Sequence, residues 1–491
     1  MKYQIHADYQ SRHEDIVYKP IATNFSYQPD VYALAQFIAQ RSELRSIIDI
    51  GTKHGGNLDT FTDDVSILVI GAMNDAINPT SDNPKIRPVP YNLEQGLPEI
   101  PDEIVEKSII ICADIIEHLK DPEPLLRQLA EMSQVAPYIL ISTPDRDRVR
   151  GWLDNGPPAN PAHVREWNGG ELVRFLTDCG FGDIPFYGHT ISTDFHKVKS
   201  TLLTLTGTHA KLPRKAPDHF TVAAIISGLN EADILEEVVI HLNQQGIQVH
   251  YFDNWSTDGS WEIMCNLRDQ GAVMHCGRFP DKPSDQHELY LDLQNKVSYG
   301  EQLRADWIIH HDADEIRICP WLACTLKDAI AHVDALGFNA IDFTVIDFRY
   351  TRYNEEIFKN YENGLTHFEF GRRPGHFSQL KCWKNQKNVI LTESGGHEAR
   401  FPGRRIFPLK FLLKHYPLRN RSQAKTKIFR DRLPRFKKGK ELYGWHTHYD
   451  VYMESGVIPE WESYNLIPWH PILFNTEYLV ERLSGIGLSG K

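Results

Sequence analysis

Cysteine is scarce in this chain, and its placement excludes two classes of site. Seven cysteines occur among 491 residues, and no two of them form a Cys-x-x-Cys pair. Cys319 and Cys324 are the nearest pair, and a zinc site would need further ligands close to them. An odd, scattered set is also unlike the disulfide framework of a secreted protein. We therefore expect free thiols in a reducing cytoplasm.

Long apolar runs and an excess of basic residues are also missing. No run approaches the roughly 18 apolar residues that cross a bilayer, and residues 1–10 contain no apolar segment of the kind found in secretory signals. The chain has 53 Lys and Arg against 65 Asp and Glu, a net charge of −12. We therefore expect a cytoplasmic protein with no nucleic-acid partner. Its length predicts two or three domains.

Strand and helix patterns alternate through the first 205 residues. An apolar run at 46–50 enters a glycine-rich turn, and further apolar runs follow at 65–70, 107–112 and 138–144. Alternation of this kind predicts a parallel, doubly wound α/β sheet with a helix on each crossover. Ligands of such sheets bind at the carboxyl ends of the strands. The residues at two of these ends are Asp49, Gly51, Gly55 and Asp114.

This part resembles the class I S-adenosylmethionine-dependent methyltransferases over roughly residues 45–190. The resemblance is carried by Asp-Ile-Gly at 49–51 with Gly55, by the 114–122 stretch with its Glu-His-Leu, by Ile-Ser-Thr-Pro at 141–144, and by 163–167 and 171–181. It implies a domain over residues 1–205 in which Asp49, Gly51, Gly55 and Asp114 bind S-adenosylmethionine.

Two departures from the family pattern leave alternatives open. Lys53 replaces the middle glycine of the loop, and the acid expected after the second strand is absent at Ala72, with Asn74 and Asp75 just beyond. The domain is either a methyltransferase acting on a sugar or glycan, or a degenerate scaffold. His163 and Glu166 are then either a base pair for an acceptor hydroxyl or residues that close the site.

Residues 206–218 are rich in proline and basic residues without apolar periodicity, which is typical of a linker. A second domain is predicted over 219–491. Its strands at 220–227, 248–252 and 307–312 each end in a polar turn, so we expect the three turns to meet at one edge of a parallel sheet. These turns contain Asn230, Glu231, Asp253, Asp258, Asp312 and Asp314.

Paired acids at the end of a buried strand are costly to desolvate without a cation. Mg²⁺ or Mn²⁺ prefers carboxylate oxygens and often shares them with substrate phosphates. Asp312 and Asp314 are therefore a candidate metal–diphosphate site. A solvated turn is the alternative for these two acids, and an Asx-type turn is the alternative for Asp253 and Asp258.

The three turns together resemble the nucleotide-sugar half of family 2-like GT-A glycosyltransferases. The matching residues are 227–232, 253–260 and 312–315. The resemblance implies a second Rossmann-like domain in which Asn230 and Glu231 line the nucleotide pocket and Asp253 meets the base or ribose. Asp312 and Asp314 would then serve the ribose and the cation, and His397 or His415 would complete the metal shell.

The rest of the second domain supplies candidates for the acceptor side. An inverting transferase needs a carboxylate base near the acceptor hydroxyl, and Glu393, Glu398 and Asp347 are the candidates. Residues 404–440 hold 14 Lys and Arg against one acid, Asp431. This segment is predicted to meet a donor diphosphate, a lipid-linked acceptor or an anionic membrane surface, unless it is simply a solvated basic helix.

The sequence thus predicts two doubly wound domains and a metal-dependent glycosyltransferase. Its donor is a nucleotide sugar, its acceptor is a glycan or lipid-linked glycan, and the fused domain methylates the glycan. Two alternatives remain: a methyltransferase whose C-terminal half only binds glycan, and a glycosyltransferase with a non-catalytic N-terminal scaffold.

Overall fold

The computed structural model describes the chain apart from residues 1, 14–24, 52–54, 72–82, 287, 353–360, 372–375, 436–440, 443, 445–451, 453–454 and 487–491. The chain divides into two compact units. The first consists of residues 1–212 together with 472–491, and the second of residues 213–471. Among the described helices, none is both long and apolar enough to cross a bilayer.

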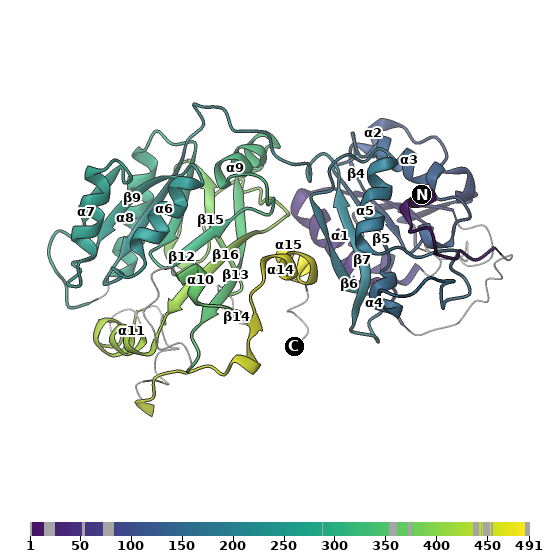
Figure 1. Cartoon of the computed structure of the whole chain (residues 1–491). Helices are drawn as coiled ribbons and strands as arrows, with labels where there is room; N and C mark the ends of the chain where they lie inside the picture. The colour runs from purple at the N-terminus through teal and green to yellow at the C-terminus, as the bar shows by residue number, and fades with distance from the viewer. Residues whose placement is uncertain are drawn as a thin grey trace. The chain divides into compact units, whose positions relative to one another are not determined.

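The first unit is built on a seven-stranded sheet in the order β3-β2-β1-β4-β5-β7-β6 (Figure 1). Strands β1 to β5 run parallel, β7 pairs antiparallel with β5, and β6 pairs antiparallel with β7. The strands are β1 (Ser46–Ile50), β2 (Ser66–Ile70), β3 (Ile86–Val89), β4 (Ser108–Ala113), β5 (Tyr138–Pro144), β6 (Phe186–Ile191) and β7 (Lys199–Thr206).

The central strands of the first unit have apolar side chains on both faces of the sheet. Helices therefore cover the sheet. Ile48, Ile110 and Ile139 pack with Leu126 and Phe175 in one buried cluster. The helices are α1 (Pro29–Ser42), α2 (Asp102–Val105), α3 (Glu123–Met132), α4 (Arg146–Arg150) and α5 (Gly169–Asp178). The predicted parallel α/β sheet is confirmed for this part of the chain.

Two helices from the C-terminus also belong to the first unit. They are α14 (Pro471–Glu477), from Ile472 onward, and α15 (Leu479–Leu483). Gly188 of β6 allows them to approach, because a Cβ there would lie 2.5 Å from the Thr476 carbonyl oxygen. The Lys199 ammonium lies 2.8 Å from a Glu481 carboxylate oxygen. The sequence-based division assigned residues 472–491 to the second domain, and in this respect the structure differs from it.

The second unit is built on a sheet in the order β10-β9-β8-β11-β15-β13-β14-β17, with β16 beside β13 and β12 beside β16. Strands β10, β9, β8 and β11 are parallel, while β15 runs antiparallel to both β11 and β13. The strands are β8 (Val222–Gly228), β9 (Gln248–Asp253), β10 (His275–Arg278), β11 (Trp307–Asp312), β12 (Glu315–Ile318), β13 (Ala340–Arg349), β14 (His367–Phe370), β15 (Ser378–Lys384), β16 (Phe411–Leu418) and β17 (Ile467–Pro468).

In the first half of the second unit, helices follow the polar turns after β8 and β9 (Figure 1). The helices of this unit are α6 (Leu235–Gln244), α7 (Ser260–Asp269), α8 (Leu289–Gln302), α9 (Leu326–Ala335), α10 (Tyr361–Gly364) and α11 (Arg421–Lys425), the last continued by a π-helical turn over Thr426–Arg432. That turn brings part of the basic segment to the sheet edge described below. Lys437, Lys438, Lys440 and Trp445 lie outside the described residues.

Candidate functional site

The glycine-rich turn of the first unit follows β1 directly. Gly51 has a φ of +77°, and a Cβ there would lie 2.3 Å from the Ile115 Cδ1 atom. Its N–H donates to the Ile70 carbonyl oxygen at 2.7 Å. Glycine is therefore required for the tight bend at this strand end. Gly55 begins the 3₁₀ turn Gly55–Thr60. Lys53, Ala72, Asn74 and Asp75 lie outside the described residues.

The two acids predicted to bind S-adenosylmethionine lie at the carboxyl ends of the neighbouring strands β1 and β4. Asp49 is fully buried and accepts a hydrogen bond from the Tyr32 hydroxyl at 2.8 Å. Asp114 follows β4 with a φ of 53°, and its Oδ2 accepts from the Gln28 amide at 2.7 Å. Gln28 and Tyr32 come from the start of α1, so this helix sets the position of both carboxylates.

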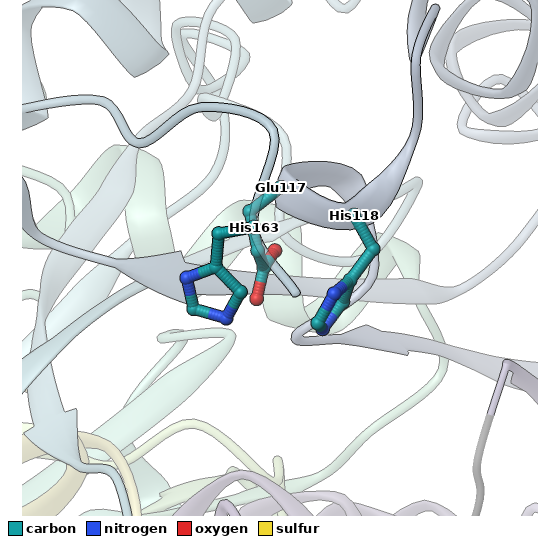
Figure 2. Close-up of side chains that lie close together, drawn as sticks. All are labelled: Glu117, His118 and His163. Carbon is teal, nitrogen blue, oxygen red and sulfur yellow. The ribbon is translucent and has the colours of Figure 1, made fainter. Parts of the chain in front are cut away.

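A second group of polar side chains lies just beyond β4 and contains Glu117, His118 and His163 (Figure 2). One ligand atom of each lies within 4.8 Å of the others. Among the residues that the structure describes, this is the one group of three or more His, Cys, Asp and Glu side chains close enough to share a metal ion. The Thr143 hydroxyl, at the end of β5, donates to Glu117 Oε2 at 2.9 Å.

Each imidazole of this group is fixed through its Nδ1 atom. His163 Nδ1 lies 2.6 Å from Glu166 Oε1, so the pair suggested by the sequence is in contact. His118 Nδ1 lies 2.8 Å from the Ala162 carbonyl oxygen. The two rings meet edge to face with their centroids 4.8 Å apart.

Two carboxyl groups of this region, those of Glu117 and Glu166, are buried. Burial, reinforced by the neighbouring Asp114 carboxylate, raises the pKa of Glu117 well above its ordinary value. Glu117 Oε1 and Glu166 Oε2 are buried and accept no hydrogen bond from the described residues. Burying such acceptors costs free energy of folding unless a proton or a cation binds to them.

In the second unit, the predicted acids gather at the carboxyl ends of three adjacent parallel strands. Glu231 lies beyond the end of β8, while Asp253 ends β9 and Asp312 ends β11. The strand registers pair Gly228 with Asp253 and Ser227 with Asp312. The expected convergence of the three turns is therefore present.

Asn230, Asp253 and Asp258 are engaged in the turns themselves. Asp253 accepts from the Ser256 N–H at 3.0 Å, and Asp258 accepts from the Ser260 N–H at 3.0 Å. Asn230, with a φ of 57°, accepts a hydrogen bond from the Thr257 N–H at 2.8 Å. This bond links the turn after β8 to the turn after β9. These contacts have the character of Asx turns, and they fix the shape of the edge.

Two cations from the basic segment lie among the remaining acids. Lys427 Nζ is 2.7 Å from Asp314 Oδ2 and 2.7 Å from Glu231 Oε1. The fully buried Arg419 donates to Glu231 at 2.6 Å and to Asp233 at 2.7 Å. Burial acts to raise the pKa of Asp314, but the Lys427 ammonium outweighs it and holds that pKa well below the ordinary value.

His415 joins Asp314 to Asp347. Its Nδ1 lies 2.7 Å from Asp347 Oδ1, and its Nε2 lies 3.7 Å from Asp314 Oδ1. The other oxygen of Asp347 accepts from Arg349 at 2.9 Å. Burial lowers the pKa of His415, but the two carboxylates outweigh burial and raise it above 6.5.

The four predicted metal ligands of this unit do not form one group in the structure. Asp314 and His415 approach each other, whereas Asp312 is paired with the buried Lys381 at 2.6 Å. Lys381 also lies 2.8 Å from Glu315. His397 Nδ1 is buried without a hydrogen-bond partner among the described residues, and burial lowers the pKa of this ring to about 4.

The candidate bases differ in their surroundings. Glu393 and Glu398 both pair with the exposed Arg400 at 3.0 Å, and Glu398 also pairs with Arg404 at 2.8 Å. Asp347 instead belongs to the chain of contacts that includes Asp314.

Sequence reasoning missed the residues that neutralise the acids. Lys381 lies in a strand that was not predicted, and Lys427 and Arg419 were included only as part of a basic segment. The excess of cations over acids in residues 404–440 was the available signal. The Glu117 group was also missed, although Glu117, His118 and His163 all lie in the stretches that resembled methyltransferases.

Comparison with known proteins gives matches to methyltransferases. Residues 27–184 match a family model described as a methyltransferase domain. The first unit therefore contains a region that is similar to methyltransferase domains. Two Mycobacterium tuberculosis proteins, named probable S-adenosylmethionine-dependent methyltransferases, are 30% identical to this chain over 156 residues. The match covers 31% of this chain, and the chain spans about half, 54%, of each relative.

Solved structures similar to the methyltransferase domain are more distant in sequence. A SAM-dependent methyltransferase from Aquifex aeolicus is 17% identical, with 37% of this chain and 89% of that chain covered and a TM-score of 0.27. The N-terminal domain of EvdMO1, crystallised in the presence of SAH and D-fucose, is 15% identical, with 40% and 90% covered and a TM-score of 0.28.

Proposed function

We propose that the first unit transfers a methyl group from S-adenosylmethionine. The family match to residues 27–184 is the observation that carries this proposal, and the names of the two mycobacterial relatives agree with it. The described part of the strand edge fits the donor: Gly51 forms a turn that has no room for a side chain, and Asp49 and Asp114 flank it. Gly51, Gly55, Asp49 and Asp114 would hold the donor, which supplies an electrophilic methyl group.

We propose that the second unit transfers a sugar from a nucleotide-sugar donor to a glycan or lipid-linked glycan. The supporting observation is the convergence of Glu231, Asp312 and Asp314 with Lys427 at one edge of a parallel sheet. A departing nucleoside diphosphate develops negative charge, and cations placed in advance at that position stabilise the transition state. The fused methyltransferase would then act on a hydroxyl of the same glycan.

A divalent ion, Mn²⁺ or Mg²⁺, is part of this second proposal. Asp314 Oδ1 and His415 Nε2, 3.7 Å apart, are the predicted ligand atoms that approach each other. Lys427 contacts the other oxygen of Asp314, Oδ2, so an ion on Oδ1 would bind beside this ammonium group. Asp312 would contribute from its half-exposed position, and His397 completes the proposed set.

Proposed roles on the acceptor side follow from the surroundings of the three carboxylates. Both oxygens of Asp347 are engaged, by His415 and by Arg349, so its proposed role is to orient His415. Glu393 and Glu398 remain the proposed bases, and a bound acceptor would have to loosen their contacts with Arg400. The basic segment at 404–440 is proposed to meet phosphates of the donor or of a lipid-linked acceptor, with peripheral contact to the inner membrane face as an extension.

A thermal-shift panel on the full chain tests both proposals separately, because a ligand of the native state raises the melting temperature by mass action. The panel contains S-adenosylmethionine, its demethylated product, and nucleoside diphosphates with and without Mn²⁺. We expect a rise with the methyl donor that Gly51→Ala abolishes, and a Mn²⁺-dependent rise with one nucleotide that Asp314→Asn abolishes.

The panel also separates the alternatives. If the methyl donor does not shift the melting temperature but a nucleotide does, the first unit is a scaffold domain. If the methyl donor shifts the melting temperature but no nucleotide does, the protein is a methyltransferase whose second unit only binds glycan. Asp269→Asn is the matched control, because this exposed acid of α7 pairs with the exposed Arg268 and its loss should leave every shift unchanged.

A further inference from the structure

We propose that Glu117, His118 and His163 bind a divalent transition-metal ion at the carboxyl edge of the methyltransferase sheet. The three side chains come from two segments of the chain, the turn after β4 and the loop before α5. Figure 2 shows the Glu117 carboxylate between the two imidazole rings. A shared ion requires ligand atoms a few ångströms apart, and these lie within 4.8 Å of one another.

Among the described residues, no ion pair balances the Glu117 carboxylate. Glu117 is fully buried, and its Oε1 atom accepts no hydrogen bond among the described residues. Two buried arginines of the same unit are engaged elsewhere. Arg165 donates to the carbonyl oxygens of Leu119 and Lys120, and Arg146 donates to Glu171. A buried carboxylate without a cationic partner is expensive, so a cation is the missing component.

The orientation of the two imidazoles also fits a metal site. A metal-binding histidine characteristically donates its other ring N–H to a carboxylate or a carbonyl oxygen, which fixes the tautomer. Both rings have this arrangement, because His163 Nδ1 contacts Glu166 Oε1 and His118 Nδ1 contacts the Ala162 carbonyl oxygen. In each ring the lone pair is thereby placed on Nε2. The Asn160 amide now lies 2.9 Å from His163 Nε2, and an ion would displace it.

The ligand types indicate the class of ion. Two imidazole nitrogens and one carboxylate oxygen suit Zn²⁺ or Mn²⁺ better than Ca²⁺ or Mg²⁺, which favour oxygen ligands throughout. Three protein ligands leave at least one position for an outside oxygen, as in catalytic zinc sites. We assign that position to the acceptor hydroxyl, whose pKa the ion would lower. This role rests on the proposed methyl transfer, whereas ion binding itself does not.

The test measures metal binding by the full chain after treatment with a chelator. Zn²⁺ and Mn²⁺ are titrated by calorimetry into the wild type and into Glu117→Gln and His163→Asn. We expect both variants to lose one equivalent of ion or to bind it at least about 10-fold more weakly. Glu117→Gln keeps the shape of the side chain, and its folding is verified by circular dichroism. His118→Gln provides a second route if His163→Asn fails to fold.

Two controls assign the ion to this site. His196→Ala removes an exposed histidine of the same unit and should bind as the wild type does. Asp314→Asn removes the proposed ligand of the second unit and should retain the equivalent that depends on Glu117. Equal binding by the wild type and Glu117→Gln would overturn the inference, as would no binding by the wild type, since Glu117 would then simply be protonated.

The outcomes for the two proposals are separable. Ion binding with no thermal shift by S-adenosylmethionine would leave the metal site intact and remove the methyl-transfer proposal. If S-adenosylmethionine instead shifts the wild type and Glu117→Gln equally and the wild type binds no ion, the methyl-transfer proposal would stand and the metal site would be removed.

Discussion

Lys427 Nζ lies 2.7 Å from a carboxylate oxygen of Asp314 and 2.7 Å from one of Glu231, although Lys427 is more than a hundred positions from each of them in the chain. All three are buried. The ammonium group therefore neutralises two acids that end different strands of one parallel sheet. Arg419 and Arg432 also contact Glu231, so Lys427 matters most for Asp314.

Lys427→Met should destabilise the second unit. Breaking a buried ion pair from one side leaves an uncompensated charge, which costs about 3 kcal/mol. The carboxylate of Asp314 will also bind a proton more readily, so the loss should shrink as pH is lowered. Urea unfolding followed by tryptophan fluorescence measures the change. Arg421→Ala, which removes an exposed pair with Glu460, should cost less than about 1 kcal/mol. Equal losses in the two variants would contradict the assigned role.

Gly188→Ala should destabilise the first unit by displacing its C-terminal helices. The new methyl group would lie 2.5 Å from the Thr476 carbonyl oxygen and 2.7 Å from Leu479 Cβ, so α14 and α15 would have to shift. A core substitution that overpacks typically costs about 1–3 kcal/mol. The melting temperature should fall, and protease cleavage near the C-terminus should accelerate. Gly170→Ala is the control, because its methyl group would lie 3.2 Å from the flexible end of Arg174 and at an ordinary contact distance of 3.8 Å from Asn168 Oδ1.

His250 should make the second unit less stable in mild acid. Burial, with His275 nearby, lowers the pKa of His250 from 6.5 to about 4. The unfolded chain therefore binds a proton at a pH where the folded chain does not, so stability is full above 6.5 and falls as pH drops toward 4. The slope for one proton is at most about 1.4 kcal/mol per pH unit. His250→Asn should show a shallower decline in urea unfolding between these pH values. An unchanged slope would mean that other groups cause the whole effect.

The sequence was most informative where strands are buried on both faces. Residues 46–50 and 138–144 are apolar runs, and the structure has β1 and β5 at those positions. It was least informative where polar side chains are buried by partners distant in the chain. The Thr and Leu mixture at 199–206 was not predicted as a strand but forms β7, whose residues 201–206 are buried. Lys381 and Lys414 interrupt the apolar pattern of β15 and β16 because they pair with Glu315 and Glu362.

The candidate sites also contain a part that could be predicted from the sequence and a part that could not. Acids at strand ends could be placed from sequence, because a parallel sheet collects them at one edge. Their partners could not, because nothing local to Lys427 or Lys381 indicates which carboxylate each one meets. The Glu117 group combines both situations: Glu117 and His118 follow a predictable strand, while His163 reaches them from a loop 45 positions later.

Asp314→Asn should reduce sugar transfer in the full chain by about 100-fold or more, the loss typical when one charge-stabilising group is removed from a site. The amide keeps the shape of the side chain but not its charge, so neither Lys427 nor a divalent ion is held as firmly. Hydrolysis or transfer of radiolabelled sugar nucleotide, measured over a range of Mn²⁺ concentrations, separates the two causes. Rescue at high Mn²⁺ would place the ion at Asp314, whereas an equal deficit at every Mn²⁺ concentration would assign the loss to the Lys427 contact. Methyl transfer by the same variant should be unchanged, because Asp314 belongs to the other unit. Normal sugar transfer by Asp314→Asn would contradict the proposed donor site.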